Sequence, residues 1–239
     1  TGIAILWHVL RQAGAEVSFY VPHRIEEGYG LNLEALRKAV ADGAGLVVSI
    51  DCGITAVAEA DWLATQKVPL IVSDHHSTHG ALPAADVIVH PALDASYPNP
   101  HLCGAGVAFK IAWALAQNLS GSTRVSEDYR TLLQELLPLA AIGTIADVVP
   151  LVGENRIITR HGLGTLPQST LPGVRALIES SGLTGAKVNG YDVGFKLAPR
   201  INAAGRMGHA RLAVELFTRA DETRAREIAM YLEEHNRAR

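Results

Sequence analysis

The 239-residue sequence is poor in cysteine and in net charge, and each shortage excludes a class of protein. Its two cysteines, Cys52 and Cys103, are too few for a disulfide framework, so we expect a reducing, cytoplasmic setting. A formal net charge of −3 gives no global signature of nucleic-acid binding. Any such binding would therefore require a local basic patch.

Long uninterrupted apolar runs are also missing, and no secretory signal is visible. The most apolar stretch, residues 136–152, contains two prolines, a glycine and Asp147, and falls short of the roughly 20 apolar residues that a spanning helix needs. The three tryptophans fall at helical spacings and indicate core packing rather than a base-stacking platform. The sequence therefore predicts a protein without a membrane partner.

The sequence is rich in apolar residues, which make up 48% of it, whereas charged residues make up 19%. This composition is sufficient to form a substantial core. In its first hundred residues, helical patterns alternate with short apolar runs, which predicts a parallel sheet with helices on both faces. The helical patterns cover residues 3–13, 32–42 and 55–66, and the strand-like runs cover residues 16–21, 45–50, 68–72 and 86–90.

The remaining residues show mainly helical patterns. These cover residues 104–119, 128–142, 155–166, 172–181 and 210–219, and a last helix begins at Asp221 as N-cap. The predicted fold class is therefore α/β, with a parallel sheet flanked by helices, then a mostly helical half and a long C-terminal connecting helix.

Ionisable residues follow two neighbouring strands of the predicted sheet. Asp51 comes directly after the run 45–50, and Asp74-His75-His76 follow the run 68–72. Because a single helix connects the two strands, a right-handed crossover makes them parallel and brings both groups to one edge of the sheet. Carboxylate and neutral imidazole both bind divalent metals. We interpret this edge as a metal site; the alternative is a polar surface turn.

Two further features lie later in the sequence. Asp147 is isolated in the apolar run 140–150, where a carboxylate must find a partner or raise its pKa, although an N-cap or a buried hydrogen-bonded Asp is the alternative. Arg200 and Arg206 stand six residues apart among small residues, which suits close approach to a phosphate. The alternative for both arginines is a solvated loop.

Together these segments resemble the DHH phosphoesterase superfamily and, within it, the RecJ family of single-strand-specific exonucleases. The resemblance extends over essentially the whole chain. Three segments match motifs of the superfamily: Asp51-Cys52-Gly53, where Asn is common in place of Cys52, Asp74-His75-His76, and residues 143–150. Three more are similar to RecJ in particular: residues 24–31, 103–109 and 199–207.

The resemblance implies a role for each ionisable residue at the sheet edge. Asp51 would be a bridging metal ligand, with His75 and Asp147 as further ligands in a site for two Mn²⁺ or Mg²⁺ ions. Asp74 would orient His75, and His76 would face the scissile phosphate as a hydrogen-bond donor or proton shuttle.

The implied function is metal-dependent hydrolysis of single-stranded DNA by a 5′-to-3′ exonuclease that acts in DNA repair and recombination. Arg200, Asn202 and Arg206 would hold the DNA backbone near the cut, and replication or repair proteins are further partners. Two alternatives stay open. One is a phosphodiesterase for short oligonucleotides or cyclic dinucleotides, and the other is a non-catalytic relative that binds DNA or a protein partner.

The family's first acidic motif is absent from the sequence, and we expect it upstream of Thr1. A C-terminal nucleic-acid-binding domain would follow Arg239. On this resemblance we expect a catalytic core fragment, with a phosphoesterase domain over residues 1–209 and a helical connector over residues 210–239. We expect the fragment alone to show at most trace nuclease activity.

Overall fold

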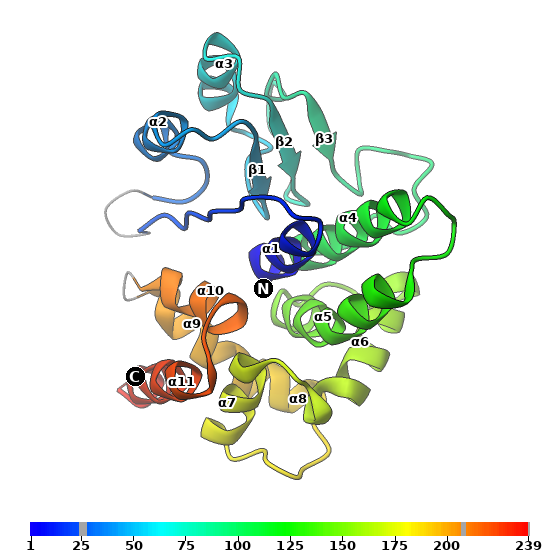
Figure 1. Ribbon diagram of the computed structural model, residues 1–239, viewed down its shortest axis with the longest axis vertical. Coiled ribbons are helices and arrows are strands. Elements are labelled where there is room, and N and C mark those ends of the chain that lie inside the picture. The colour runs from blue at the N-terminus through cyan, green and yellow to red at the C-terminus, as the bar shows by residue number, and fades with distance from the viewer. Residues whose placement is uncertain (24–27, 207–208, 239) are drawn as a thin grey trace.

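A three-stranded parallel sheet forms the upper part of the molecule in Figure 1. The computed structural model describes residues 1–23, 28–206 and 209–238, without the side chain of Arg206. The strands, in the order in which they pair, are β1 (Val47–Ile50), β2 (Leu70–Ser73) and β3 (Val87–Val89). Ile50 pairs with Ser73, so Asp51 and Asp74 leave adjacent strands at the same level. The predicted α/β fold class and parallel sheet are confirmed.

Alternating side chains of the sheet enter two different cores, as its period of two requires. Val47, Leu70 and Val72 pack with the apolar side chains of α2 and α3 on one face. Val48 and Ile50 pack into a larger core on the other face, with α1 and α4. The helices that cover the sheet are α1 (Gly2–Gln12), α2 (Leu33–Ala41), α3 (Val57–Thr65) and α4 (Gly104–Leu119).

The rest of the chain is helical and shares the larger core. Its elements are α5 (Glu127–Ala146), α6 (Gly153–Thr165), η1 (Leu166–Gln168), α7 (Pro172–Ser180), α8 (Gly190–Asp192), η2 (Val193–Leu197), α9 (Ala198–Arg206), α10 (Ala210–Thr218) and α11 (Glu222–Arg237). Helix α10 contributes Leu216 to this core, and α11 contributes Ile228 and Leu232. The boundary expected at residue 209 stays a prediction. Among the described residues, no helix is both long enough and apolar enough to cross a membrane.

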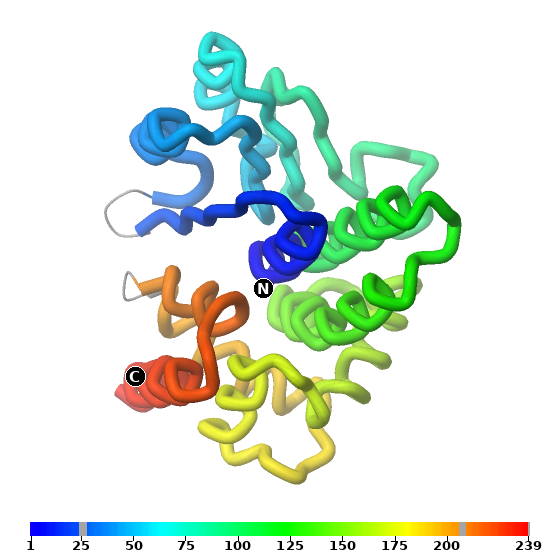
Figure 2. Tube along the Cα trace, in the orientation of Figure 1, coloured from blue at the N-terminus to red at the C-terminus, as the bar shows by residue number. Residues whose placement is uncertain are grey.

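The predicted strand over residues 16–21 is wrong. Residues 15–23 have no regular secondary structure, and Figure 2 traces them as the segment that leads from α1 back toward α2. A strand needs a hydrogen-bonded neighbour, and of the described strands β1 pairs only with β2. The apolar alternation in this segment was therefore not sufficient to predict a strand.

A helical stretch that the sequence analysis did not predict covers residues 190–206. A π-helical turn, η2, connects α8 to α9 and shifts the helical register. Three glycines and a proline lie in the same stretch and hide its periodicity. Arg200 and Asn202 consequently lie on a helix and not on a loop, while the helices capped by Asn32 and Asp221 form as predicted.

His8 of α1 gives the fold a pH dependence that can be measured. Its Nε2 donates to the Phe217 carbonyl at 2.8 Å, joining α1 to α10. Burial lowers the pKa of His8, and the hydrogen bond and Glu135 oppose this only in part. Between the lowered pKa of folded His8 and the ordinary pKa of about 6.5, the unfolded chain therefore binds more protons than the folded chain, and stability falls as the pH drops through this window.

We expect the variant His8→Gln, which keeps an N–H donor but does not titrate, to lose stability less steeply between pH 6.5 and pH 5. Urea midpoints of both proteins across this range measure the difference. Parallel pH profiles for the two proteins would contradict the assignment.

Candidate metal centre

The turn after β1 aims the side chain of Asp51 away from the plane of the strand. Asp51 has φ +64°, in the left-handed region that non-glycine residues seldom adopt. Its N–H donates to the Ser73 carbonyl at 2.8 Å, so the turn starts on the last rung of the β1–β2 ladder. Gly53, at φ +106°, completes the turn against Ser49. This backbone presents the carboxylate to the residues that follow β2.

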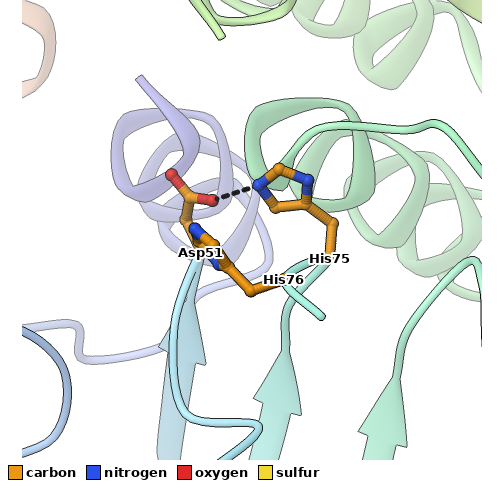
Figure 3. Close-up of side chains that lie close together, drawn as sticks. All are labelled: Asp51, His75 and His76. Atoms are coloured by element: carbon orange, nitrogen blue, oxygen red, sulfur yellow. Dashed lines mark ion pairs between the residues drawn. The ribbon is translucent and has the colours of Figure 1, made fainter. Parts of the chain in front are cut away.

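Asp51, His75 and Asp147 meet at one point. His75 Nε2 lies 3.0 Å from Asp51 Oδ1 and 3.5 Å from Asp147 Oδ2. Figure 3 shows the ring of His75 directed at the Asp51 carboxylate, with His76 beside it. Asp51 Oδ1 and His75 Nε2 are buried, and among the described residues they have no hydrogen-bond partner outside this cluster. The structure thus brings together the three residues predicted as metal ligands.

The electrostatics of this cluster follow from its crowding. The nearby Asp51 carboxylate raises the pKa of His75, against the effect of burial. Burial raises the pKa of Asp147, and Asp51 adds to the shift while His75 opposes it. The two carboxylates thus repel each other, while both favour a positive charge between them, on His75 or on a bound cation.

Asp74, unlike Asp51 and Asp147, is fully buried, below the two histidines that follow it. It accepts hydrogen bonds from the backbone N–H groups of Ile54, His75 and His76, at 3.0, 2.8 and 3.2 Å. His76 Nδ1 lies 2.7 Å from its Oδ1. Burial alone would raise the pKa of Asp74, but these donors hold that pKa below its ordinary value. The carboxylate thus orients the ring of His76, whereas the sequence analysis expected it to orient His75.

The N-terminus of α4 approaches the Asp51 carboxylate so closely that only glycine fits. A Cβ at Gly104 would lie 2.2 Å from Asp51 Oδ1 and 2.4 Å from Asp51 Cβ. Cys103 is the N-cap of α4, and its sulfur accepts from the Gly106 N–H at 3.3 Å. The positive end of the helix dipole consequently faces the Asp51 carboxylate. No local pattern in the sequence predicted this contact.

Asp147 lies at the C-cap of α5, because the helix continues four residues beyond its predicted end at 142. The next residue, Val148, has φ +59° and an 86% exposed side chain. A β-branched residue in the left-handed region is strained, and such strain persists where the surrounding structure enforces it. The strained turn fixes Asp147 opposite His75.

Two residues near the site escaped the sequence analysis as functional candidates. His90, buried at the end of β3, donates from Nε2 to the His76 carbonyl at 2.9 Å and accepts from the Ala92 N–H at Nδ1, which fixes its tautomer. Tyr29 donates from its hydroxyl to the Asp51 carbonyl. Both contacts join residues from different strands or loops, so no local spacing could reveal them.

A cavity of about 440 Å³ opens directly over these groups. Its lining residues are Gly28, Tyr29, Asp51, His76 and Asp147. The face of the cluster that is not buried is therefore accessible to a substrate.

Of the three residues predicted to bind phosphate (Arg200, Asn202 and Arg206), only some are seen to be available for it. Arg200 is 12% exposed, its Nε lies 2.5 Å from Glu233 Oε2 on α11, and its Nη1 donates to the Lys196 carbonyl at 2.6 Å. Asn202 is exposed on α9, and among the described residues its side chain makes no hydrogen bond. Arg206 ends α9, and its side chain lies outside the described residues, as do residues 24–27 and Met207 of the RecJ-like segments.

The donor set at the sheet edge fits a divalent cation. Ligand atoms of Asp51, His75 and His76 all lie within 4.8 Å of one another, and Asp51 Oδ1 and Asp147 Oδ2 both lie close to His75 Nε2. Carboxylate oxygens with imidazole nitrogen suit Mn²⁺ and Mg²⁺. A cation there would compensate the negative charge of the two carboxylates, which share a single imidazole.

The sheet edge joins an Asp-His-His motif to the further acids Asp51 and Asp147, and the matching family model is named for this motif. A model described as "DHH family, N-terminal domain" matches residues 1–144, and the chain belongs to the DHH family.

Within that family, the similar proteins include single-stranded-DNA-specific exonucleases RecJ. The chain is 40% identical to RecJ of Bacillus subtilis and 38% identical to RecJ of Escherichia coli, in both cases over its full length. It spans 29% and 42% of those two proteins, less than half of either. A crystal structure of exonuclease RecJ bound to manganese matches with a TM-score of 0.88 at 39% identity, covering 99% of this chain and 58% of that one. RecJ of Thermus thermophilus in complex with Mn²⁺ matches with a TM-score of 0.84 at 36% identity, covering 99% of this chain and 33% of that one.

Proposed function

We propose that this chain is the catalytic core of a metal-dependent 5′-to-3′ exonuclease that hydrolyses single-stranded DNA in cytoplasmic repair and recombination. The observation that carries the proposal is the meeting of Asp51, His75 and Asp147 at one point, where His75 Nε2 lies 3.0 Å from Asp51 Oδ1 and 3.5 Å from Asp147 Oδ2. The similarity to RecJ proteins, named for action on single-stranded DNA, supports the choice of substrate.

Asp51, His75 and Asp147 would hold the metal, with Asp51 as the bridging ligand of a two-metal site. Mn²⁺ or Mg²⁺ ions, when bound, lower the pKa of a water molecule and neutralise charge on the phosphate. The left-handed turns at Asp51 and Val148 position both carboxylates beside His75 Nε2.

His76 and Asp74 would act on the phosphodiester. The ionised Asp74 accepts from Nδ1, so Nε2 of His76 is the atom free to hold or release a proton at the cavity. A buried carboxylate that orients an imidazole in this way is the arrangement found in acid–base catalysis. The leaving oxygen needs a proton when the bond breaks, and His76 is the residue placed to supply it.

The DNA backbone would be held by the exposed face of α9. Asn202 is exposed on this face, and the charge of Arg206 makes it a second candidate; Arg200 would contact phosphate with the guanidinium donors that Glu233 and Lys196 leave open. Single-stranded DNA is the proposed partner, together with replication or repair proteins that bind the complete protein.

We expect Arg206→Ala to weaken binding of single-stranded DNA and to reduce its salt slope by about one unit, because one counterion-releasing contact is lost. Asn202→Ala should weaken binding without changing the slope. The loss should be equal for all DNA sequences, since backbone contacts carry no base information. Fluorescence anisotropy across a salt series measures both effects, and unchanged slopes in Arg206→Ala would contradict the proposal for that residue.

Arg200→Ala should also lower stability, by about 1–3 kcal/mol, because Oε2 of the largely buried Glu233 carboxylate loses its partner while Oε1 keeps its ion pair with the exposed Arg237. Glu233→Gln separates the two roles of Arg200. If Arg200 binds phosphate, this variant should keep or increase DNA affinity. A fall in affinity would show that Arg200 acts only by holding α9 in place through its ion pair with Glu233.

The proposed function is tested with the complete protein and with DNA labelled at either end. Mononucleotides should be released from the 5′ end of single strands in Mn²⁺, with none in EDTA and few from duplex DNA. Faster hydrolysis of dinucleotides than of long strands would favour the oligonucleotide phosphodiesterase instead. Tight DNA binding without hydrolysis in any divalent metal would favour the non-catalytic relative.

A further inference from the structure

Tyr29 contacts both Asp51 and His76 in the candidate site. Its hydroxyl donates to the backbone carbonyl of Asp51, and its ring meets that of His76 edge to face, with centroids 6.0 Å apart and planes at 72°. It also lines the cavity over the cluster. One side chain thus contacts the proposed bridging ligand and the proposed proton donor.

The loop that carries Tyr29 is built to hold the ring in this place. Gly28 and Gly30, on either side of Tyr29, have φ +83° and +100°, which only glycine adopts without strain. The two left-handed residues turn the chain sharply on both sides of Tyr29. Asn32, two residues after Gly30, is the N-cap of α2 and joins the loop to a regular helix.

The hydrogen bond from Tyr29 acts on the left-handed turn that carries Asp51. Asp51 stands at φ +64°, a conformation that few non-glycine residues adopt and that aspartate tolerates better than most. The carbonyl that accepts the bond belongs to the peptide plane that follows the Asp51 Cα. Fixing that plane limits the rotation of Asp51 about ψ and, with the Ser73 hydrogen bond on its other side, the direction of its Cβ.

We propose that Tyr29 is a positioning residue, whose hydroxyl holds Asp51 in metal-binding geometry and whose ring fixes the position of the His76 imidazole. The inference rests on the proposed function, because it assigns a supporting role at the same site. Tyr29 itself touches neither metal nor the reacting atoms in this role. Groups that orient a metal ligand typically contribute 10–100-fold to metal affinity or activity.

The test uses Tyr29→Phe, which removes only the hydroxyl, and Tyr29→Leu, which also removes the ring, in the complete protein. Tyr191→Phe, an exposed tyrosine on α8, is the matched control. Mn²⁺ binding is followed by electron paramagnetic resonance in the absence of DNA. Steady-state hydrolysis gives kcat and KM, and hydrogen exchange of the peptide that covers residues 50–54 is measured without metal.

For Tyr29→Phe we expect Mn²⁺ affinity and kcat to fall about 10–100-fold, with KM nearly unchanged and the unfolding midpoint close to that of the wild type. Exchange in residues 50–54 should be faster, because Asp51 N–H and Ile54 N–H then open more often. Tyr29→Leu should lose further kcat through His76, whereas Tyr191→Phe should match the wild type in every measurement.

Other outcomes would overturn the inference. Wild-type Mn²⁺ affinity and kcat in Tyr29→Phe would show that the hydroxyl does not position Asp51. A rise in KM alone would assign Tyr29 to substrate contact. If the wild type neither binds Mn²⁺ nor hydrolyses DNA, the proposed function fails, and the metal-free exchange measurement alone then decides whether Tyr29 holds the Asp51 turn.

Discussion

Asp51→Asn in the complete protein is expected to reduce Mn²⁺-supported hydrolysis on the order of 1,000-fold. Asparagine has the size of aspartate and tolerates the left-handed conformation at φ +64°, so the turn after β1 should persist. What is lost is the charge of the carboxylate that lies 3.0 Å from His75 Nε2. Hydrolysis and Mn²⁺ binding are measured together, at metal concentrations up to saturation.

Asp42→Asn is the matched control, since Asp42 is an exposed acid at the C-cap of α2, outside the site. It should behave as the wild type in both assays. Near-normal turnover of Asp51→Asn at saturating Mn²⁺ would remove Asp51 from the ligand set. An unfolded Asp51→Asn protein, revealed by its circular dichroism, would contradict the argument that the turn tolerates asparagine.

Gly104→Ala is expected to lower hydrolysis about 100-fold, because a misplacement of roughly 1 Å at a reacting group has an effect of that size. The new Cβ would lie 2.2, 2.3 and 2.4 Å from Oδ1, Cγ and Cβ of Asp51. A rotation of the carboxylate cannot relieve the contact with Asp51 Cβ, so the backbone of the strained turn must shift. Mn²⁺ affinity should fall together with the rate.

Gly164→Ala in α6 provides the control for this substitution. A Cβ there meets nothing within 4 Å, so we expect a gain of roughly 0.5–1 kcal/mol in stability and no change in activity. Normal Mn²⁺ affinity in Gly104→Ala would show that the closeness of α4 to Asp51 has no functional consequence.

The sheet and the edge that bears the site could be predicted because their signals are local. A buried strand followed by Asp51, one helix, and a second strand followed by Asp74-His75-His76 leaves little freedom in topology. The observed register pairs Ile50 with Ser73, so the two acidic groups leave the sheet side by side.

Other parts of the site depend on contacts between distant segments, and local patterns do not contain them. Asp147 reaches His75 only because α5 continues to Ala146, against an expected end at residue 142. Tyr29 and Asp51 are 22 residues apart, and His90 and His76 are 14 apart. The ion pair of Arg200 with Glu233 likewise joins helices α9 and α11, which no spacing predicts.

The errors in the predicted fold have the same origin. Residues 16–21 alternate as a strand does, yet whether a segment becomes a strand is decided by a neighbour in space. Residues 190–206 lack a clean helical period, because a π-turn and three glycines interrupt it, and tertiary packing forms the helix nonetheless.

The backbone at Val148 affects how this chain could be engineered for heat resistance. Valine in the left-handed region costs about 1–2 kcal/mol, and its 86% exposed side chain regains almost nothing through burial. Glycine is the more stable choice at that position, so a screen that rewards melting temperature alone would select it. The Val148→Gly substitution would also loosen the turn that holds Asp147 close to His75. A thermostable library of this protein would thus accumulate catalytically impaired members at this position, unless turnover is scored beside melting temperature.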